Sequence, residues 1–178
     1  MLGSNSKTKA HNQSLQPTQK PLRGFRSSEF GRYQSMHTDH FIQNLEKRAN
    51  KNGLKFKVRK PAIESAIVAF EERNRITMPQ QVKLFYLMCN GLKVEAPSLE
   101  IKSIEELNID ETGKIIFAAI DKRHRICFDV SKNNATPQWA ILNYDTGFIV
   151  TLTMASFWTN KIFAWLDKRR TIWKEETY

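Results

Sequence analysis

The chain has 178 residues, of which 40% are hydrophobic, and its formal net charge is +10. This length fits one domain with an appended segment, and the apolar content is enough for an ordinary hydrophobic core. No run approaches the roughly 18 apolar residues of a membrane-spanning helix, and no apolar stretch follows Met1 as a secretory signal requires. We therefore expect neither a membrane span nor secretion.

The positive charge is concentrated in the first third of the chain. Residues 1–60 contain thirteen lysines and arginines against three acidic residues, whereas residues 61–178 contain fifteen of each. This asymmetry predicts an acidic partner for the N-terminal part, such as nucleic acid, anionic lipid or an acidic protein assembly.

Residues 1–37 are rich in small polar residues and lysine and show no helical or strand period, so we expect an extended basic tail that is disordered when alone. Disordered segments are usually poor in aromatic residues, but here aromatics alternate with arginines, which favours a segment that folds onto a partner. The predicted partner-binding residues of the tail are Arg23, Phe25, Arg26, Phe30, Arg32 and Tyr33. The alternative is a solvated tail with incidental aromatics.

The tail also has no acidic residue before Glu29, as in a mitochondrial presequence, but Gly3, Pro17, Pro21 and Gly24 interrupt an amphipathic helix. A mitochondrial location is therefore an alternative only.

Residues 38–178 are predicted to form the folded domain. Thr38 is a candidate N-cap for a first helix that ends near Gly53. Residues 54–58 then alternate apolar and basic side chains, which predicts a strand with one buried and one basic face. Lys55, Lys57 and the following Arg59 are assigned to the partner-binding surface.

Two helices are predicted next, each opened by a proline. The first begins at Pro61 and the second at Pro79, and Asn90-Gly91 is predicted to end the second because glycine adopts the left-handed conformation easily. The first helix has an apolar face at helical spacing, and Glu71–Arg75 are read as its solvated end. The apolar faces comprise Ile63, Ala66, Ile67 and Phe70 in the first helix, and Val82, Phe85, Tyr86 and Cys89 in the second.

The remaining residues predict a mostly antiparallel sheet and a final helix, which makes the fold class α+β. Ser103–Glu106 fit a capping box, and polar turns at 121–124 and 145–147 separate neighbouring strands. Ser156 is predicted to cap the final helix, whose apolar face comprises Trp158, Ile162, Trp165, Leu166 and Ile172. The predicted strands are residues 98–102, 115–120, 125–130, 138–144 and 148–153.

The segment from Ile63 to Gly91 resembles the SUKH superfamily, which includes fungal cell-wall-assembly regulators and bacterial toxin-immunity proteins. The matching features are Phe70-Glu71, then Met78-Pro79 where the family has Leu-Pro, then Phe85-Tyr86 and Asn90-Gly91. Ser156-Phe157 before the final helix also fits the family pattern. The resemblance covers about residues 39–170 and implies a SUKH-like sheet with helices packed on it.

Within that superfamily, Met78–Gly91 is most similar to the non-catalytic subunit two of the tubulin polyglutamylase complex. This resemblance implies a tubulin-linked, ciliary setting and a place in a large hetero-complex.

No pattern in the sequence supports catalysis or a cofactor. The four histidines are not spaced with cysteines or carboxylates as a metal site requires, and no nucleophile elbow, phosphate-binding loop or dinucleotide fingerprint is present. Cys89 and Cys127 lie in apolar patterns and are expected to be buried free thiols, so a pair of Cys127 with His124 is not expected to react. We expect a non-enzymatic protein with no metal and no cofactor.

The leading hypothesis is a structural or adaptor subunit that docks on an acidic protein lattice through its basic tail, as a microtubule-associated or axonemal protein of the cytoskeleton or cilium. A scaffold subunit of a polyglutamylase complex is one alternative, and an RNA-binding subunit of a ribonucleoprotein such as an organellar ribosome is another. Toxin immunity fits poorly, because an inhibitor of a basic nuclease tends to be acidic.

Overall fold

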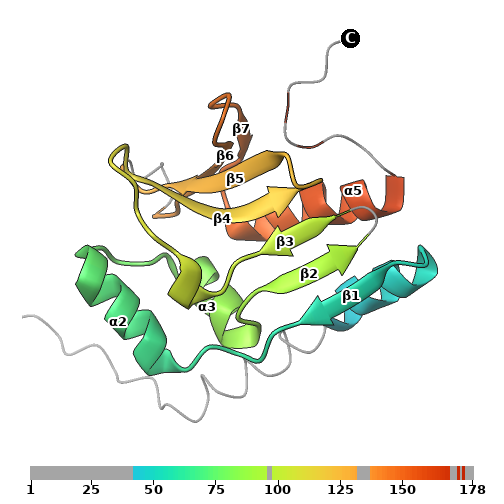
Figure 1. The fold of residues 1–178 in the computed structure, drawn as a ribbon, viewed down its shortest axis with the longest axis horizontal. Coiled ribbons are helices and arrows are strands. Elements are labelled where there is room, and N and C mark those ends of the chain that lie inside the picture. Colours follow the sequence, from blue (N-terminus) through green and yellow to red (C-terminus); the bar gives the residue numbers. More distant parts are fainter. Residues whose placement is uncertain (1–41, 96–97, 132–136, 169–171, 173, 175–178) are drawn as a thin grey trace, which may run out of the picture.

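The computed structural model describes residues 42–95, 98–131, 137–168, 172 and 174, and it shows an α+β fold built on one seven-stranded antiparallel sheet (Figure 1). The strands follow one another across the sheet in sequence order from β1 to β7. The strands are β1 (Lys55–Val58), β2 (Leu92–Glu95), β3 (Leu99–Ile101), β4 (Lys114–Ile120), β5 (His124–Asp129), β6 (Ala140–Asn143) and β7 (Ile149–Thr151). The predicted fold class is confirmed, while the extended tail at residues 1–37 lies outside the described residues.

Helices cover one face of this sheet, while the helix at residues 64–74 lies to the side of the strands. The described helices are residues 42–51, α2 (Glu64–Asn74), α3 (Gln80–Met88) and one continuous run of α4 (Met154–Ser156), η2 (Phe157–Ile162) and α5 (Phe163–Lys168), with a short 3₁₀ turn, η1 (Ile104–Glu106). In Figure 1 the run ending in α5 and the helix at residues 42–51 lie behind the strands. No helix of the described chain crosses the face turned to the viewer.

The core between sheet and helices is rich in aromatic side chains, because large rings bury much apolar area in well-defined contacts. Phe117 of β4 stacks on Phe128 of β5 with ring centroids 3.9 Å apart, and Phe157 of η2 meets Phe117 edge-on at 5.5 Å. On the other side, Phe85 of α3 stacks on Trp158 at 5.4 Å. The final helix therefore touches both the middle of the sheet and α3.

The apolar face of α3 is confirmed, since Val82, Phe85, Tyr86 and Cys89 are all buried. Its predicted end is wrong in detail. The helix stops at Met88 because Cys89 is already extended, with φ −149° and ψ 131°. Gly91 does have a positive φ of 94°, but it leads into β2 rather than capping the helix.

The connection after α3 is held by several hydrogen bonds. The Asn90 side chain accepts from the Ile104 N–H at 2.8 Å and donates to Glu105 at 2.8 Å, and the Gly91 carbonyl accepts from the Arg59 N–H at 3.0 Å. A Cβ on Gly91 would lie 2.5 Å from the Ile101 carbonyl oxygen. This position therefore requires glycine for its conformation and also for space.

Further details differ from the sequence predictions, and the first is that α2 begins at Glu64 and not at Pro61. Strand β2 was not predicted, since Leu92–Glu95 has only two apolar residues directly after a helix pattern. Ile63 precedes α2 as its N-cap and is 69% exposed, so its predicted core position is wrong. Pro79 is likewise the N-cap of α3 rather than its first helical residue. The final helix is capped by Thr153, whose hydroxyl accepts from the Ser156 N–H at 3.1 Å, and not by Ser156.

Glu71 is also more than a solvated helix residue. Its carboxylate accepts from the Met78 N–H at 2.6 Å and pairs with Lys83 at 2.9 Å. Because Met78 precedes α3 and Lys83 lies within it, Glu71 fixes the angle at which α3 follows α2. The capping box at Ser103–Glu106 is confirmed.

Gly91→Ala is expected to destabilise the fold by more than about 2 kcal/mol, because it adds left-handed backbone strain and a clash with Ile101. Gly53→Ala is the matched control, since Gly53 has a φ of +65° but nothing within 4 Å of its Cβ position. Gly53→Ala is expected to lower the free energy of unfolding by only about 1 kcal/mol. Urea unfolding followed by tryptophan fluorescence measures both, and equal losses would contradict the steric argument.

Tyr86→Phe is expected to raise the unfolding free energy by about 1 kcal/mol. The Tyr86 side chain is completely buried, and its hydroxyl has no hydrogen-bond partner within the described part of the chain. Removing the hydroxyl abolishes the cost of taking it out of water and keeps the ring that packs edge-on against Phe85. The same urea titration tests this, and a loss of stability would show that the hydroxyl is satisfied.

Candidate interaction surface

The sheet face opposite the helices, here called the open face, carries most of the charged strand side chains. Side chains alternate between the two faces of a strand, and directly paired residues share a face. The register pairs Lys57 with Lys93 and Lys93 with Glu100, and further along the sheet Ile116 with Cys127. These five residues define the open face from the β1 edge to the middle of the sheet.

The sequence predicted nine partner-binding residues, and the structure describes three of them. Lys55 and Lys57 are exposed on the open face of β1, and Arg59 follows directly after the strand. The prediction of a strand with one basic face is thereby confirmed. The other six, Arg23, Phe25, Arg26, Phe30, Arg32 and Tyr33, lie outside the described residues.

Arg59 is engaged within the domain. Its guanidinium donates to the Glu106 carboxylate at 2.7 Å, and Glu106 also accepts from the Ser103 N–H at 2.8 Å. The hydrogen bond from Ser103, together with Arg59, lowers the pKa of Glu106, so the pair stays charged at neutral pH. Arg59 therefore ties the end of β1 to η1, and the charge it offers to a partner is partly offset.

Lys55 and Lys57 are different, since neither has an ion pair within the described part of the chain. Lys55 lies opposite Glu95 in the ladder, whereas Lys57 lies opposite another lysine, Lys93. Lys93 pairs with Glu100 at 2.9 Å on its other side. Like charges directly opposite each other are unfavourable, so Lys57 is left next to a positive neighbour.

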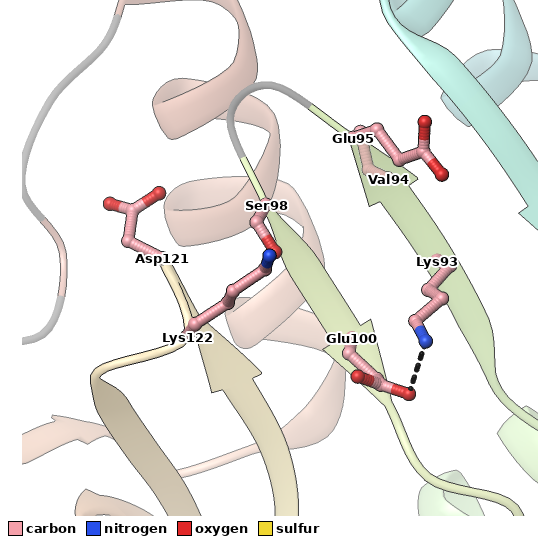
Figure 2. Close-up of a pocket in the computed structure, with 7 residues that line it drawn as sticks. All are labelled: Lys93, Val94, Glu95, Ser98, Glu100, Asp121 and Lys122. Atoms are coloured by element: carbon pink, nitrogen blue, oxygen red, sulfur yellow. Dashed lines mark ion pairs between the residues drawn. The ribbon is translucent and has the colours of Figure 1, made fainter.

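A hollow of about 620 Å³ opens between strands β2 and β3 on one side and the β4–β5 turn on the other (Figure 2). Its lining mixes two lysines with three acidic residues, and Figure 2 shows the ion pair of Lys93 with Glu100 at one side. Asp121 and Lys122 reach it from the turn, where both have positive φ values of 51° and 58°. These opposite charges nearly offset each other, so the hollow has no clear preference for an anion or a cation.

A smaller hollow of about 220 Å³ lies over the middle of the open face, beside Lys102, Asp110, Lys114 and Tyr144. The Tyr144 ring is flanked by two cations, with the Arg125 guanidinium carbon 4.5 Å and the Lys114 Nζ 5.4 Å from its centroid. Arg125 also pairs with Asp145. Most charges around this hollow are thus already satisfied within the domain.

The far half of the open face contains an apolar row between the pairs Lys114–Asp129 and Ala119–Arg125, which carry charged side chains. This row runs across the strands from Ile116 through Cys127 and Leu142 to Ile149 on β7. Cys127 and Leu142 are buried, but Ile149 is 56% exposed at the sheet edge. Sequence reasoning missed this row, because residues on four strands come together only through the register.

The structure offers no activated nucleophile among the cysteines. Burial raises the pKa of Cys89 to about 12 and that of Cys127 to about 11, so both thiols are neutral at physiological pH, as predicted from their apolar surroundings. The spacing of three residues also places His124 and Cys127 on opposite faces of β5.

Two further features are absent from the described residues. No group of three or more potential metal ligands occurs among them, and none of their helices is long and apolar enough to cross a membrane. Comparison with protein families and with curated proteins found no match to this chain.

Asp110 is expected to make the stability of the domain pH-dependent. Partial burial acts to raise its pKa, but hydrogen bonds from the Thr112 hydroxyl and the Lys114 N–H outweigh it and lower the pKa to about 2. Because the folded pKa lies below the ordinary value of 3.8, the stabilisation is complete above that pH and is lost as pH falls through about 2.

Asp110→Asn keeps the acceptor oxygen of the turn and removes the charge. We expect the variant to be less stable than the wild type at pH 7, with the difference shrinking between pH 4 and pH 2. Denaturant titrations at each pH measure it, and a constant difference would show that Asp110 acts through geometry alone.

Proposed function

We propose that this protein is a non-enzymatic adaptor subunit that docks on an acidic protein assembly through its basic N-terminal part. The observation that carries the proposal is that Lys55 and Lys57 are exposed on the open face of β1 and have no ion pair with any described residue. Like the tail, β1 lies within residues 1–60, which hold the whole charge excess, so the basic character of the tail continues onto the folded domain.

Such a surface is suited to fast, salt-dependent docking. Exposed lysines and arginines attract an acidic partner over a distance and orient it, while aromatic side chains supply buried contact area once it is bound. Because the charges of residues 61–178 balance, the first third of the chain determines which sign of charge a partner must carry.

We propose a microtubule or axonemal surface as the acidic assembly, which gives a cytoskeletal or ciliary location. The support is the resemblance of Met78–Gly91 to a non-catalytic subunit of the tubulin polyglutamylase complex. The structure gives this stretch a scaffold role, since its buried residues form core and Asn90 and Gly91 hold a junction. In this proposal the stretch is part of the scaffold, and the tail and β1 make the contact.

The test is co-sedimentation of the purified full-length protein with taxol-stabilised microtubules over a salt series. Replacing Arg23, Arg26 and Arg32 with alanine is expected to weaken binding about tenfold, since three exposed charge contacts contribute about 0.5 kcal/mol each. The matched control replaces the exposed residues Lys122, Arg123 and Lys174 with alanine, which removes the same charge from outside the first third of the chain.

Equal weakening by both variants would show that only net charge matters and would overturn the assignment to the tail. A wild-type protein that stays in the supernatant at low salt would overturn the microtubule proposal. A titration with competitor RNA supplies one further arm of the experiment. Release of the protein from microtubules by RNA at sub-stoichiometric amounts would favour the ribonucleoprotein alternative.

A further inference from the structure

The outer edge of β1 is unpaired within the described part of the chain. β1 is the first strand in the sheet order, and among the described strands it pairs only with β2. An edge strand presents a row of backbone N–H and C=O groups that another extended segment can join. Which residues offer those groups can be read from the register.

The backbone groups that face outward belong to Phe56 and Val58. The Arg59 N–H donates to the Gly91 carbonyl at 3.0 Å, which continues the register that pairs Lys57 with Lys93. Hydrogen-bonded and non-hydrogen-bonded pairs alternate along an antiparallel ladder. Lys55, Lys57 and Arg59 therefore direct their backbone groups toward β2, and the two residues between them direct theirs away from it.

The side chains along this edge define the chemistry of an added strand. Phe56 and Val58 are half-buried on the helix side, whereas Lys55 and Lys57 are exposed on the open face. A strand added at the edge would place alternate side chains next to each of these two sets. Apolar residues suit the first set, and carboxylates suit the second.

The charge pattern across the sheet favours an acid at this position. Reading inward from the edge, Lys57 is followed by Lys93 and then by Glu100. The ion pair of Lys93 with Glu100 satisfies the second lysine, and among the described residues of this row the first has no acidic neighbour. A carboxylate on an added strand would lie beside Lys57 and restore the alternation of sign.

We propose that β1 binds an extended acidic segment of a partner protein by strand addition, with glutamate or aspartate beside Lys55 and Lys57 and apolar residues beside Phe56 and Val58. This inference rests on the proposed docking function and names the mode of recognition. Residues 1–41 of the same chain are unsuited to the position, because they carry six basic residues against Glu29 and Asp39. A second copy of β1 would oppose lysine to lysine.

The experiment uses the full-length protein and a synthetic peptide that alternates glutamate with valine over six residues. Backbone amide exchange is followed residue by residue by NMR, with and without the peptide. The amides of Phe56 and Val58 are expected to become protected only when the peptide is present. Those of Lys55 and Lys57 are expected to be protected already in the free protein. A peptide with lysine in place of glutamate is the charge control and is expected to give no protection.

Two pairs of variants separate the contribution of backbone hydrogen bonds to peptide binding from that of side-chain charge. Val58→Pro removes an outward N–H that an edge strand can lose, and Val58→Ala is its control because it shortens the side chain but keeps the N–H. Peptide affinity is expected to fall about fivefold to tenfold in Val58→Pro relative to Val58→Ala, as for one lost hydrogen bond. Lys57→Glu is expected to weaken binding more than Lys51→Glu, which makes the same charge change on the first helix. If Val58→Pro does not fold, the comparison of Lys57→Glu with Lys51→Glu still tests the proposed binding at β1.

The outcomes distinguish this inference from the proposed function. Absence of peptide binding, or protection that falls elsewhere than at Phe56 and Val58, overturns strand addition. Lys55 and Lys57 would then serve only to keep the edge from pairing with other copies of the chain. If microtubule binding is at the same time lost in the tail variant but kept in Lys57→Glu, the docking proposal stands without β1.

Discussion

The close approach of Gly91 to the end of β3 is the constraint on which the rest of the sheet depends. At this point the chain leaves α3 and enters β2, and its backbone passes so near the Ile101 carbonyl that no side chain fits. The Gly91 carbonyl holds the end of β1 through Arg59, and the Asn90 side chain holds η1 through Ile104. One dipeptide thus fixes β1, β2, β3 and η1 relative to α3, and any shift there would change the register of the basic edge.

The two faces of the sheet have different physical roles. The covered face is held by aromatic rings, with Phe117 and Phe128 at its centre and Trp158 joining it to α3. The open face is held by ion pairs between neighbouring strands and by the cations that flank Tyr144. Exposed ion pairs add little stability each. The open face can therefore accept changes of charge that the covered face could not, and a recognition surface can evolve there without loss of the fold.

Local sequence patterns were enough to predict most elements, because each depends on residues close in the chain. The alternation around Lys55 and Lys57 placed β1 correctly, and the apolar spacing of Val82, Phe85 and Tyr86 placed α3. The capping box at Ser103 was recognisable because both of its hydrogen bonds join residues three apart. Six of the nine predicted partner-binding residues lie outside the described chain and remain predictions.

What could not be predicted depends on contacts between distant segments. Strand β2 exists because it lies between β1 and β3, and its four residues carry no strong signal of their own. Glu71 looked like a solvated charge because its partners, Met78 and Lys83, belong to the next helix. Asp121 and Lys122 likewise have positive φ values although neither is a glycine, so the sequence did not indicate this backbone conformation.

The order of the strands has a consequence for how the chain folds. From β2 to β7 each strand pairs with its neighbour in sequence, so these pairings close short loops and are kinetically favourable. β1 is separated from β2 by α2 and α3, so the pairing of these two strands closes a longer loop at a higher entropic cost. The basic strand is thus expected to be the last to join the sheet, and in a growing chain it would remain unpaired until β2 has been synthesised.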